Sequence, residues 1–337
     1  MGGPGRREHR RKSRHGSHRR RRWAVFLMFL ACLFGLLGLT YLYPPEEAPV
    51  SRVELPAVKS EPAPPQPTPQ ATARTLRTRL EQVTAEYPGT YGVVVYDPST
   101  QKTVTLNADR RFLAASLNKL PVLFALYRAA ASGEVNLEDE ISMLRSDVQA
   151  YGTGVLYKHP VGYTMTLREC AELMIKESDN TAWAMLHRYL GRDYIEAELN
   201  RIGATSTAYW TPNTTTPNDV LIMLKTAADP SYTTPELSAE MLDVMTGTSF
   251  EDRLPQPLPE GARVAHKIGS YGDTFSDAGL VFPKGSNARG DAYFIVVIAA
   301  DTTETTARSA IQDVSHTTYR LLGEPNAHKG ASSRPTP

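Results

Sequence analysis

The apolar positions of this chain fall into strand-like and helix-like stretches, and the order of the stretches outlines a fold. Residues 91–97 and 102–106 are rich in β-branched and aromatic side chains around a four-residue turn, which is typical of a β-hairpin. From residue 116 to about residue 254, apolar positions mostly repeat every three to four residues. That spacing predicts helices over 119–131, 167–177, 181–190, 194–202, 219–228 and 235–246.

Strand-like patterns stand at both ends of this helical stretch. A helical stripe at Leu76, Leu80 and Val83 precedes the hairpin, and three strand-like runs return later. Those runs lie at 263–267, 277–282 and 292–300, followed by a last helix at 303–322. The order predicts an α/β (α+β) fold, in which distant segments form one sheet and an all-helical subdomain is inserted.

An uncharged apolar run lies near the start of the chain. Residues 23–43 hold no charged side chain over 21 positions and span about 30 Å as a helix, the thickness of a bilayer core. Trp23, Tyr41 and Tyr43 stand at its ends, where amphipathic rings prefer the membrane interface. Ten of the 37 basic residues crowd 1–22. We therefore expect a single-pass transmembrane helix, with a cytoplasmic basic tail and an extracytoplasmic remainder.

Other interpretations of the apolar run are weaker. A cleaved signal peptide is disfavoured because the run is long and lacks a small-x-small cleavage site before the polar region. A lipid anchor at Cys32 is disfavoured because eleven more uncharged residues follow it. Residues 44–74 are a proline-rich linker, and its part 44–70, with nine prolines, reaches about 80 Å if extended. The globular domain then covers 75–323, and 324–337 form a disordered tail.

Charge and cysteine usage exclude some classes of function. The net charge is +1, but outside the basic tail acidic residues outnumber basic ones and no basic stripe follows. Because the tail abuts an apolar run, a membrane flank explains it, and nucleic-acid binding is set aside. Cys32 lies in the apolar run and Cys170 in a helical pattern far downstream, so no disulfide framework follows.

The pattern Ser-x-x-Lys occurs twice. At residues 116–119 (SLNK), a spacing of three places the Ser116 hydroxyl and the Lys119 amine on one helix face. Such a lysine can take the serine proton once its pKa is lowered by desolvation or a second cation. The second copy, Ser99 and Lys102, lies in the hairpin turn, where a lysine is solvated. The first copy has apolar neighbours on both sides, so we expect it to open a buried helix.

Two further motifs have structural explanations when each is taken alone. Residues 178–180 (SDN) precede a helical pattern, and all three residue types cap helices well. Residues 267–270 (KIGS) end a strand-like run with a turn glycine. The three motifs occur together, however. S-x-x-K, S-D-N and K-T-G in this order are the signature of class A β-lactamases and penicillin-binding proteins.

On these motifs the chain resembles the class A β-lactamase-related serine hydrolases, in the penicillin-recognising superfamily of β-lactamases and D-Ala-D-Ala peptidases. The resemblance covers about 75–323 and implies an antiparallel sheet of the β-lactamase/transpeptidase kind. It also implies a bacterial cell membrane as the location, with the catalytic domain outside. Segments similar to the family's nucleophile helix, second-motif helix, omega-loop end and substrate strand lie at 112–127, 163–180, 213–217 and 263–281.

The resemblance implies three catalytic residues. Ser116 would be the nucleophile and Lys119 its base. Ser178 would relay the proton to the leaving nitrogen. The family requires no metal and no other cofactor for this chemistry, so none is expected here.

The resemblance also implies a set of substrate-binding groups. Asn180 would hold the amide of the acyl side chain, and Lys267 would attract the substrate carboxylate. The backbone N–H groups of Ser116 and Ser270, the latter following Gly269, would form the oxyanion hole. The expected partner is a β-lactam or a peptidoglycan stem peptide.

The chain departs from the family pattern in two places. Ile268 stands where a hydroxyl residue is usual, which removes a donor to the substrate carboxylate unless Ser270 compensates. Fast β-lactamases resemble one another in an omega-loop acid, followed by Leu-Asn, that positions the deacylating water. Residues 196–200 (EAELN) match this pattern, but they lie in an amphipathic helix that ends at Gly203. The loop itself, 204–216, contains no Asp or Glu, so we expect slow hydrolysis of the acyl-enzyme.

Two functions of different classes stay open. One is an acylating hydrolase, either a weak β-lactamase or a cell-wall D,D-peptidase, that reacts at Ser116 with β-lactams or D-Ala-D-Ala peptides. The other is a binding or sensor module that kept the fold, lost turnover and detects β-lactams or cell-wall fragments through a stable adduct. The sequence leaves the natural substrate and the oligomeric state open.

Overall fold

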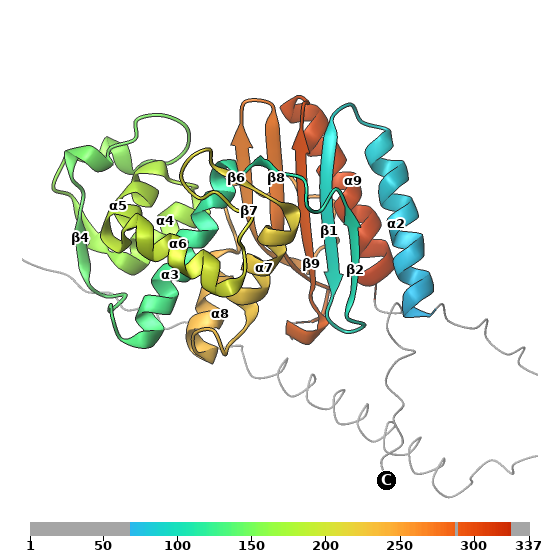
Figure 1. The fold of residues 1–337 in the computed structure, drawn as a ribbon, viewed down its shortest axis with the longest axis horizontal. Coiled ribbons are helices and arrows are strands. Elements are labelled where there is room, and N and C mark those ends of the chain that lie inside the picture. Colours follow the sequence, from blue (N-terminus) through green and yellow to red (C-terminus); the bar gives the residue numbers. More distant parts are fainter. Residues whose placement is uncertain (1–67, 287–288, 325–337) are drawn as a thin grey trace, which may run out of the picture. The chain divides into compact units, whose positions relative to one another are not determined.

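The computed structural model describes residues 68–286 and 289–324. The expected basic tail, transmembrane helix, most of the linker and most of the C-terminal tail lie outside these ranges. Within them, none of the helices combines the length and the apolar character needed to cross a bilayer. The framework of the described region is a five-stranded sheet in the order β2-β1-β9-β8-β7 (Figure 1).

The sheet joins the two ends of the described region. Its strands are β1 (Thr90–Asp97), β2 (Lys102–Leu106), β7 (Arg263–Tyr271), β8 (Thr274–Phe282) and β9 (Tyr293–Ala300). All neighbouring strands are antiparallel, and β1 pairs with both β2 and β9. The predicted sheet of N-terminal and C-terminal strands is therefore confirmed.

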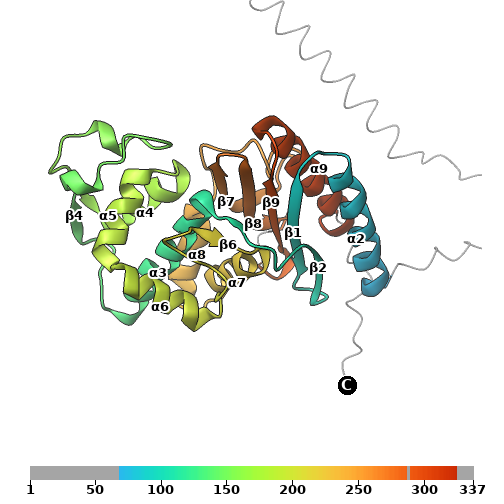
Figure 2. The same ribbon diagram turned by 45° about the horizontal axis from the view of Figure 1, so that its top comes forward.

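Helices cover both faces of the sheet. On one face lie α2 (Pro69–Ala85) and α9 (Glu304–Leu322), which run side by side in both views (Figures 1 and 2). Val93 and Val95 of β1 pack toward this pair of helices, while Val94 belongs to the core on the opposite face. Because successive side chains of a strand point to opposite faces, a strand covered on both sides becomes a nearly continuous apolar run.

The chain between β2 and β7 forms the predicted helical insertion. Its helices are α3 (Lys119–Ser132), α4 (Leu167–Lys176), α5 (Asn180–Leu190), α6 (Arg192–Ile202), α7 (Pro217–Ala228) and α8 (Pro235–Val244). It also contains two short strand pairs that the sequence did not predict. These are β3 (Phe112–Leu113) with β6 (Thr214–Thr215), and β4 (Glu140–Ser142) with β5 (Thr164–Thr166). Runs of two or three residues are too short to show a period.

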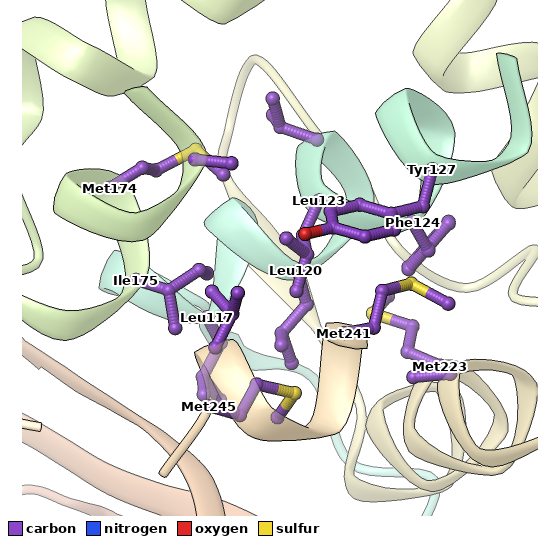
Figure 3. Packing of buried hydrophobic residues seen from close by; sticks show 14 of the residues in the cluster. Leu117, Leu120, Leu123, Phe124, Tyr127, Met174, Ile175, Met223, Met241 and Met245 are labelled. Carbon is purple, nitrogen blue, oxygen red and sulfur yellow. The ribbon is translucent and has the colours of Figure 1, made fainter. Parts of the chain in front are cut away.

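Helix α3 is buried on nearly all sides. Its residues Leu120, Leu123 and Phe124 pack among Met174 of α4 and Met241 of α8 (Figure 3). A helix that is apolar all round is typical of a core position. The first turn of α3 is therefore held by close packing, and the catalytic motif at 116–119 leads directly into it.

Candidate active site

Ser116 lies in a 3-10 turn, Ala115–Asn118 (η1), directly before α3. We expected Ser116 to open the α-helix, but the α-helix begins three residues later, at Lys119. The entry to the turn is strained, because Ala115 has φ +48°, in the left-handed region that non-glycine residues avoid. The Ser116 hydroxyl nevertheless faces the Lys119 amine, with 2.9 Å between Oγ and Nζ.

The amine of Lys119 is buried, with 2% of the residue exposed. Besides Ser116 Oγ, it lies 2.9 Å from the Ser178 carbonyl, 3.1 Å from Ser178 Oγ and 2.7 Å from Asn180 Oδ1. Burial lowers the pKa of Lys119 to about 7, although the charge of Asp179 opposes the shift. Near neutral pH a large fraction of this amine is therefore uncharged and able to accept a proton.

Asp179 caps helix α5, as the structural explanation of the second motif predicted. Its Oδ1 accepts from the backbone N–H groups of Thr181 and Ala182 at 2.8 and 2.9 Å. Its Oδ2 accepts from Val155 and Leu156 at 2.6 and 2.8 Å, which ties a separate loop to the same carboxylate. The middle residue of the motif therefore has a structural role, and it fixes the backbone on either side of it.

The two residues that flank this cap turn toward Lys119. Ser178 has φ +50°, a conformation that a serine adopts only when its surroundings impose it. The Asn180 side chain donates from Nδ2 to the Tyr151 carbonyl at 3.0 Å, which leaves Oδ1 facing Lys119. The structure thus brings Ser116, Lys119, Ser178 and Asn180 into one hydrogen-bonded group.

Lys267 joins this group from strand β7. Its Nζ donates to Ser178 Oγ at 2.9 Å and to the Ile268 carbonyl at 3.2 Å. Burial, together with the nearby charge of Lys119, holds the pKa of Lys267 well below its ordinary value. The Ser178 hydroxyl therefore lies between two amines, one from the first motif and one from the third.

Strand β7 continues through the third motif, where we expected it to end. A Cβ at Gly269 would lie 3.0 Å from the Ala114 carbonyl oxygen and 2.5 Å from Ser276 Oγ, so glycine allows β7 to approach η1. The His266 N–H donates to the Met245 carbonyl at 2.8 Å, away from β8. N–H directions alternate along an antiparallel strand, so the Ser270 N–H also points off this edge, beside η1.

Arg253 is a candidate site residue that the sequence analysis missed. Only 2% of it is exposed. Its Nη1 donates to the carbonyls of Gly269 and Ser276 at 2.9 and 2.6 Å, and its Nη2 donates to Ser270 Oγ at 2.6 Å. It thus adds a second buried cation beside the third motif. No local pattern could have found it, because Arg253 precedes Lys267 by 14 residues in an irregular stretch.

Glu196, the acid that matches the family's omega-loop pattern, lies on helix α6. It accepts from Arg192 Nε at 2.7 Å, one helical turn away, and α6 ends at Gly203 with φ +86°. The loop 204–216 approaches the nucleophile instead. The Asn213 carbonyl of this loop accepts from the N–H of Ala114, two residues before Ser116, at 2.9 Å. The interpretation of Glu196 as part of an amphipathic helix agrees with this placement.

Metal-ligating residues do not gather near this group. Among the residues that the structure describes, no set of three or more His, Cys, Asp or Glu side chains could hold a metal ion. Cys170 is a buried free thiol in α4, and burial raises its pKa. It is therefore a core residue with little thiolate character.

A partly exposed serine beside a buried lysine, at the junction of an antiparallel sheet and a helical insertion, defines a serine acylating hydrolase. The comparison with protein families agrees, because the model of the beta-lactamase enzyme family matches residues 75–322. The chain belongs to this family and is a hydrolase of the β-lactamase type. The resemblance stated from the three motifs is thereby confirmed.

Individual relatives are distant in sequence. β-Lactamase 3 of Bacillus cereus is 29% identical over 219 residues, which cover 59% of this chain and 66% of that protein. The β-lactamase of Bacillus licheniformis is 25% identical over 242 residues, covering 67% and 76%.

Solved structures show the same fold. PBP-A has a TM-score of 0.68 at 26% identity, covering 77% of this chain and 98% of its own. A β-lactamase from Sphaerobacter thermophilus has a TM-score of 0.66 at 27% identity, covering 74% and 97%. A mutant of PBP-A is known as an acyl-enzyme complex with penicillin G.

Proposed function

We propose that this protein is acylated at Ser116 by β-lactams or by D-Ala-D-Ala-type peptides. The observation that carries the proposal is the contact between Lys119 Nζ and Ser116 Oγ, at 2.9 Å, with burial lowering the lysine pKa to about 7. A lysine that is partly neutral at this distance can remove the serine proton as the hydroxyl attacks. The acyl-enzyme of the related PBP-A mutant with penicillin G supports β-lactams as one class of reagent.

The hydrogen bonds suggest a path for the proton. Ser116 Oγ attacks the carbonyl carbon and its proton passes to Lys119 Nζ. The oxyanion that forms accepts from the N–H groups of Ser116 and Ser270. When the C–N bond breaks, Ser178 gives its hydroxyl proton to the leaving nitrogen and takes one back from Lys119, 3.1 Å away.

Two cations suit the carboxylate that both substrate classes carry. Lys267 lies behind the Ser178 hydroxyl, and Arg253 lies against Ser270. Arg253 also compensates for the donor that is lost at Ile268. Its guanidinium donates to the Gly269 carbonyl and the Ser270 hydroxyl, which follow Ile268 in the strand. We therefore propose that the carboxylate binds between Ser178 and Ser270, over β7.

We propose that hydrolysis of the acyl-enzyme is slow. The loop 204–216 approaches the nucleophile and contains no carboxylate that could serve water as a base. Glu198, on α6, is held by the Arg201 guanidinium at 2.7 Å and by the Tyr232 hydroxyl at 2.8 Å. An acyl-enzyme without a base for water persists, which also suits a sensor that reports β-lactams or cell-wall fragments through a stable adduct.

Time-resolved intact-mass measurement after addition of benzylpenicillin tests the proposal. We expect one covalent adduct on the wild-type chain and none on Ser116→Ala. Ser99→Ala is the matched control, because Ser99 begins the second Ser-x-x-Lys pattern and its hydroxyl donates to Asp97 instead. Equal labelling of Ser116→Ala and wild type would refute the nucleophile. Adduct lifetime then separates a sensor from a hydrolase, and release of D-Ala from a stem peptide identifies a D,D-peptidase.

We further propose that residues 23–43 anchor the chain in a bacterial cell membrane with the catalytic domain outside. The support comes from the sequence alone, through the uncharged run and the arginines that precede it. Of the expected linker 44–74, the part that precedes α2, which begins at Pro69, would hold the domain away from the bilayer, within reach of cell-wall substrate.

A further inference from the structure

A buried cluster of charged side chains lies on the face of β7 opposite Lys267. The His266 ring and the Asp277 carboxylate are both fully buried, and Nδ1 lies 2.8 Å from Asp277 Oδ1. The other ring nitrogen, Nε2, lies 3.3 Å from both Glu251 Oε1 and Thr248 Oγ1. A carboxylate can only accept, so a ring that serves both carboxylates carries two protons and a positive charge. Burial alone would lower the pKa of His266, but Asp277 and Glu251 raise it to about 9.

The cluster ties the segment 245–254 to the sheet. Asp277 uses its second oxygen, Oδ2, to accept from the Leu254 N–H at 3.0 Å. Glu251 Oε1 also accepts from the Thr248 N–H at 2.7 Å, which closes the turn of the segment. The His266 backbone N–H bonds the start of the same segment. His266 therefore holds the segment from two sides, directly through Glu251 and through Asp277.

Arg253 depends on this segment for its position. It directly precedes Leu254, and within the described part of the chain its guanidinium donates to the Gly269 and Ser276 carbonyls and to the Ser270 hydroxyl. The charges of Asp277, Asp252 and Glu304 act on the guanidinium, and Glu304 Oε1 lies 4.0 Å from Nη2. Asp277 therefore positions Arg253 in two ways, by its charge and by its hydrogen bond to the backbone at Leu254.

We propose that His266 is a positioning residue, which acts through Asp277 and the Leu254 backbone to hold the Arg253 guanidinium against Ser270, where the substrate carboxylate binds. This role rests on the proposed function for the carboxylate site, and His266 itself does not touch substrate. A purely structural role would stabilise the fold without changing how a carboxylate ligand is bound.

Non-covalent binding tests the proposal without any acylation step. The full-length chain carrying Ser116→Ala is titrated with benzylpenicillin, followed by NMR, at pH 7 and pH 10. The second protein carries His266→Asn in addition to Ser116→Ala. Its asparagine amide can still donate to Asp277, but the positive charge of the His266 ring is lost. We expect the substitution to raise the Kd about tenfold at pH 7, the effect of one lost charge-assisted contact. At pH 10 the Ser116→Ala protein should itself bind more weakly, while the His266→Asn protein changes less. All other titrating groups, Lys119 among them, are the same in both proteins, so the difference reports His266.

A double-mutant cycle decides whether the effect runs through Arg253. Once Arg253→Met is present, His266→Asn should cause no further loss of affinity. The proposal would be overturned if the two substitutions reduced the affinity independently, so that their fold-changes in Kd multiplied. A Kd unchanged by His266→Asn would overturn it as well. The control is Ser238→Ala, which removes a buried hydrogen bond in α8 to the Ala227 carbonyl and should leave the Kd unchanged.

Two further outcomes are decisive. If circular dichroism shows that His266→Asn does not fold, Glu251→Gln replaces it in the same cycle and must raise the Kd only when Arg253 is present. If the Ser116→Ala protein binds no benzylpenicillin at all, the positioning proposal is wrong. A wild-type chain that binds but forms no adduct contradicts only the proposed function, because the Kd series involves no covalent step.

Discussion

The Lys267 amine donates a hydrogen bond to Oγ of Ser178 at 2.9 Å, and both side chains are buried. The contact joins the third sequence motif to the second across 89 residues of chain. It gives the Ser178 hydroxyl a donor on one side while Lys119 approaches from the other at 3.1 Å. A hydroxyl held in this way can give its proton to a leaving nitrogen and receive another proton from Lys119. Lys267 orients the hydroxyl, whereas Lys119 exchanges protons with it.

Loss of the base should slow acylation strongly. We expect Lys119→Met to lower the rate of penicillin labelling by about 10²–10⁴-fold, because an unassisted serine hydroxyl is a poor nucleophile. Lys102→Met is the matched control, since Lys102 has the same spacing from a serine but is the exposed first residue of β2. Rapid-quench mass spectrometry measures both rates. A Lys119→Met protein that labels as fast as Lys102→Met would contradict the assignment.

The acylation rate should follow the titration of Lys119. Burial lowers its pKa from 10.5 to about 7, so the neutral, proton-accepting form is scarce at pH 5 and dominant at pH 8. Below pH 7 we expect the rate to rise about tenfold per pH unit and then to level off above it. Initial labelling rates from pH 5 to pH 8 measure this. A profile that is flat across that range, on a chain that stays folded, would show that another group is the base.

The adduct on Ser116 should persist for minutes or longer, and Glu196 should not affect its lifetime. Glu196 pairs with Arg192 on α6, so Glu196→Gln removes a helix contact and leaves the acyl-enzyme unchanged. A lost deacylating base would instead lengthen the lifetime by about 10²–10⁴-fold. Mass spectrometry after removal of free penicillin measures the lifetime. Fast turnover by wild type, together with a trapped adduct in Glu196→Gln, would show an ordinary β-lactamase.

Asp179 should be important for stability. Its buried carboxylate accepts four backbone N–H groups, two from α5 and two from the loop at 155–156. We expect Asp179→Asn to lower the free energy of unfolding by about 2–3 kcal/mol, because the amide loses the charge and one acceptor. Asp193→Asn, in the exposed first turn of α6, should change it by at most about 0.5 kcal/mol. Urea unfolding measures both, and equal losses would contradict the buried role.

The topology of the chain is open to a direct test. Protease added to intact spheroplasts should release a fragment that begins after residue 44 and before α2 at Pro69, because this part of the expected linker should lie outside the membrane. Edman sequencing or mass spectrometry identifies the new N-terminus. Complete protection of the catalytic domain would show that the N-terminal arginines do not set the expected orientation.

The main elements were predictable because their signals are local. The helical period that begins at Lys119 and the hairpin at 91–106 are present in short windows of sequence, and the structure has both. The 3-10 turn at Ser116 was not predicted, because packing against Gly269, more than 150 residues later, shapes it. The short strand pairs were missed for a related reason, since their register depends on partners that are distant in sequence.

The sequence by itself determined which residue types form the site, through three motifs and their order, and it determined that the loop 204–216 has no carboxylate. Only the tertiary structure decided how those residues are tuned. The pKa of Lys119 falls because core helices exclude water from it, and Arg253 becomes a site residue because the segment 245–254 folds against β7. Desolvation and position arise from atoms that distant segments bring together, and no local pattern carries that information.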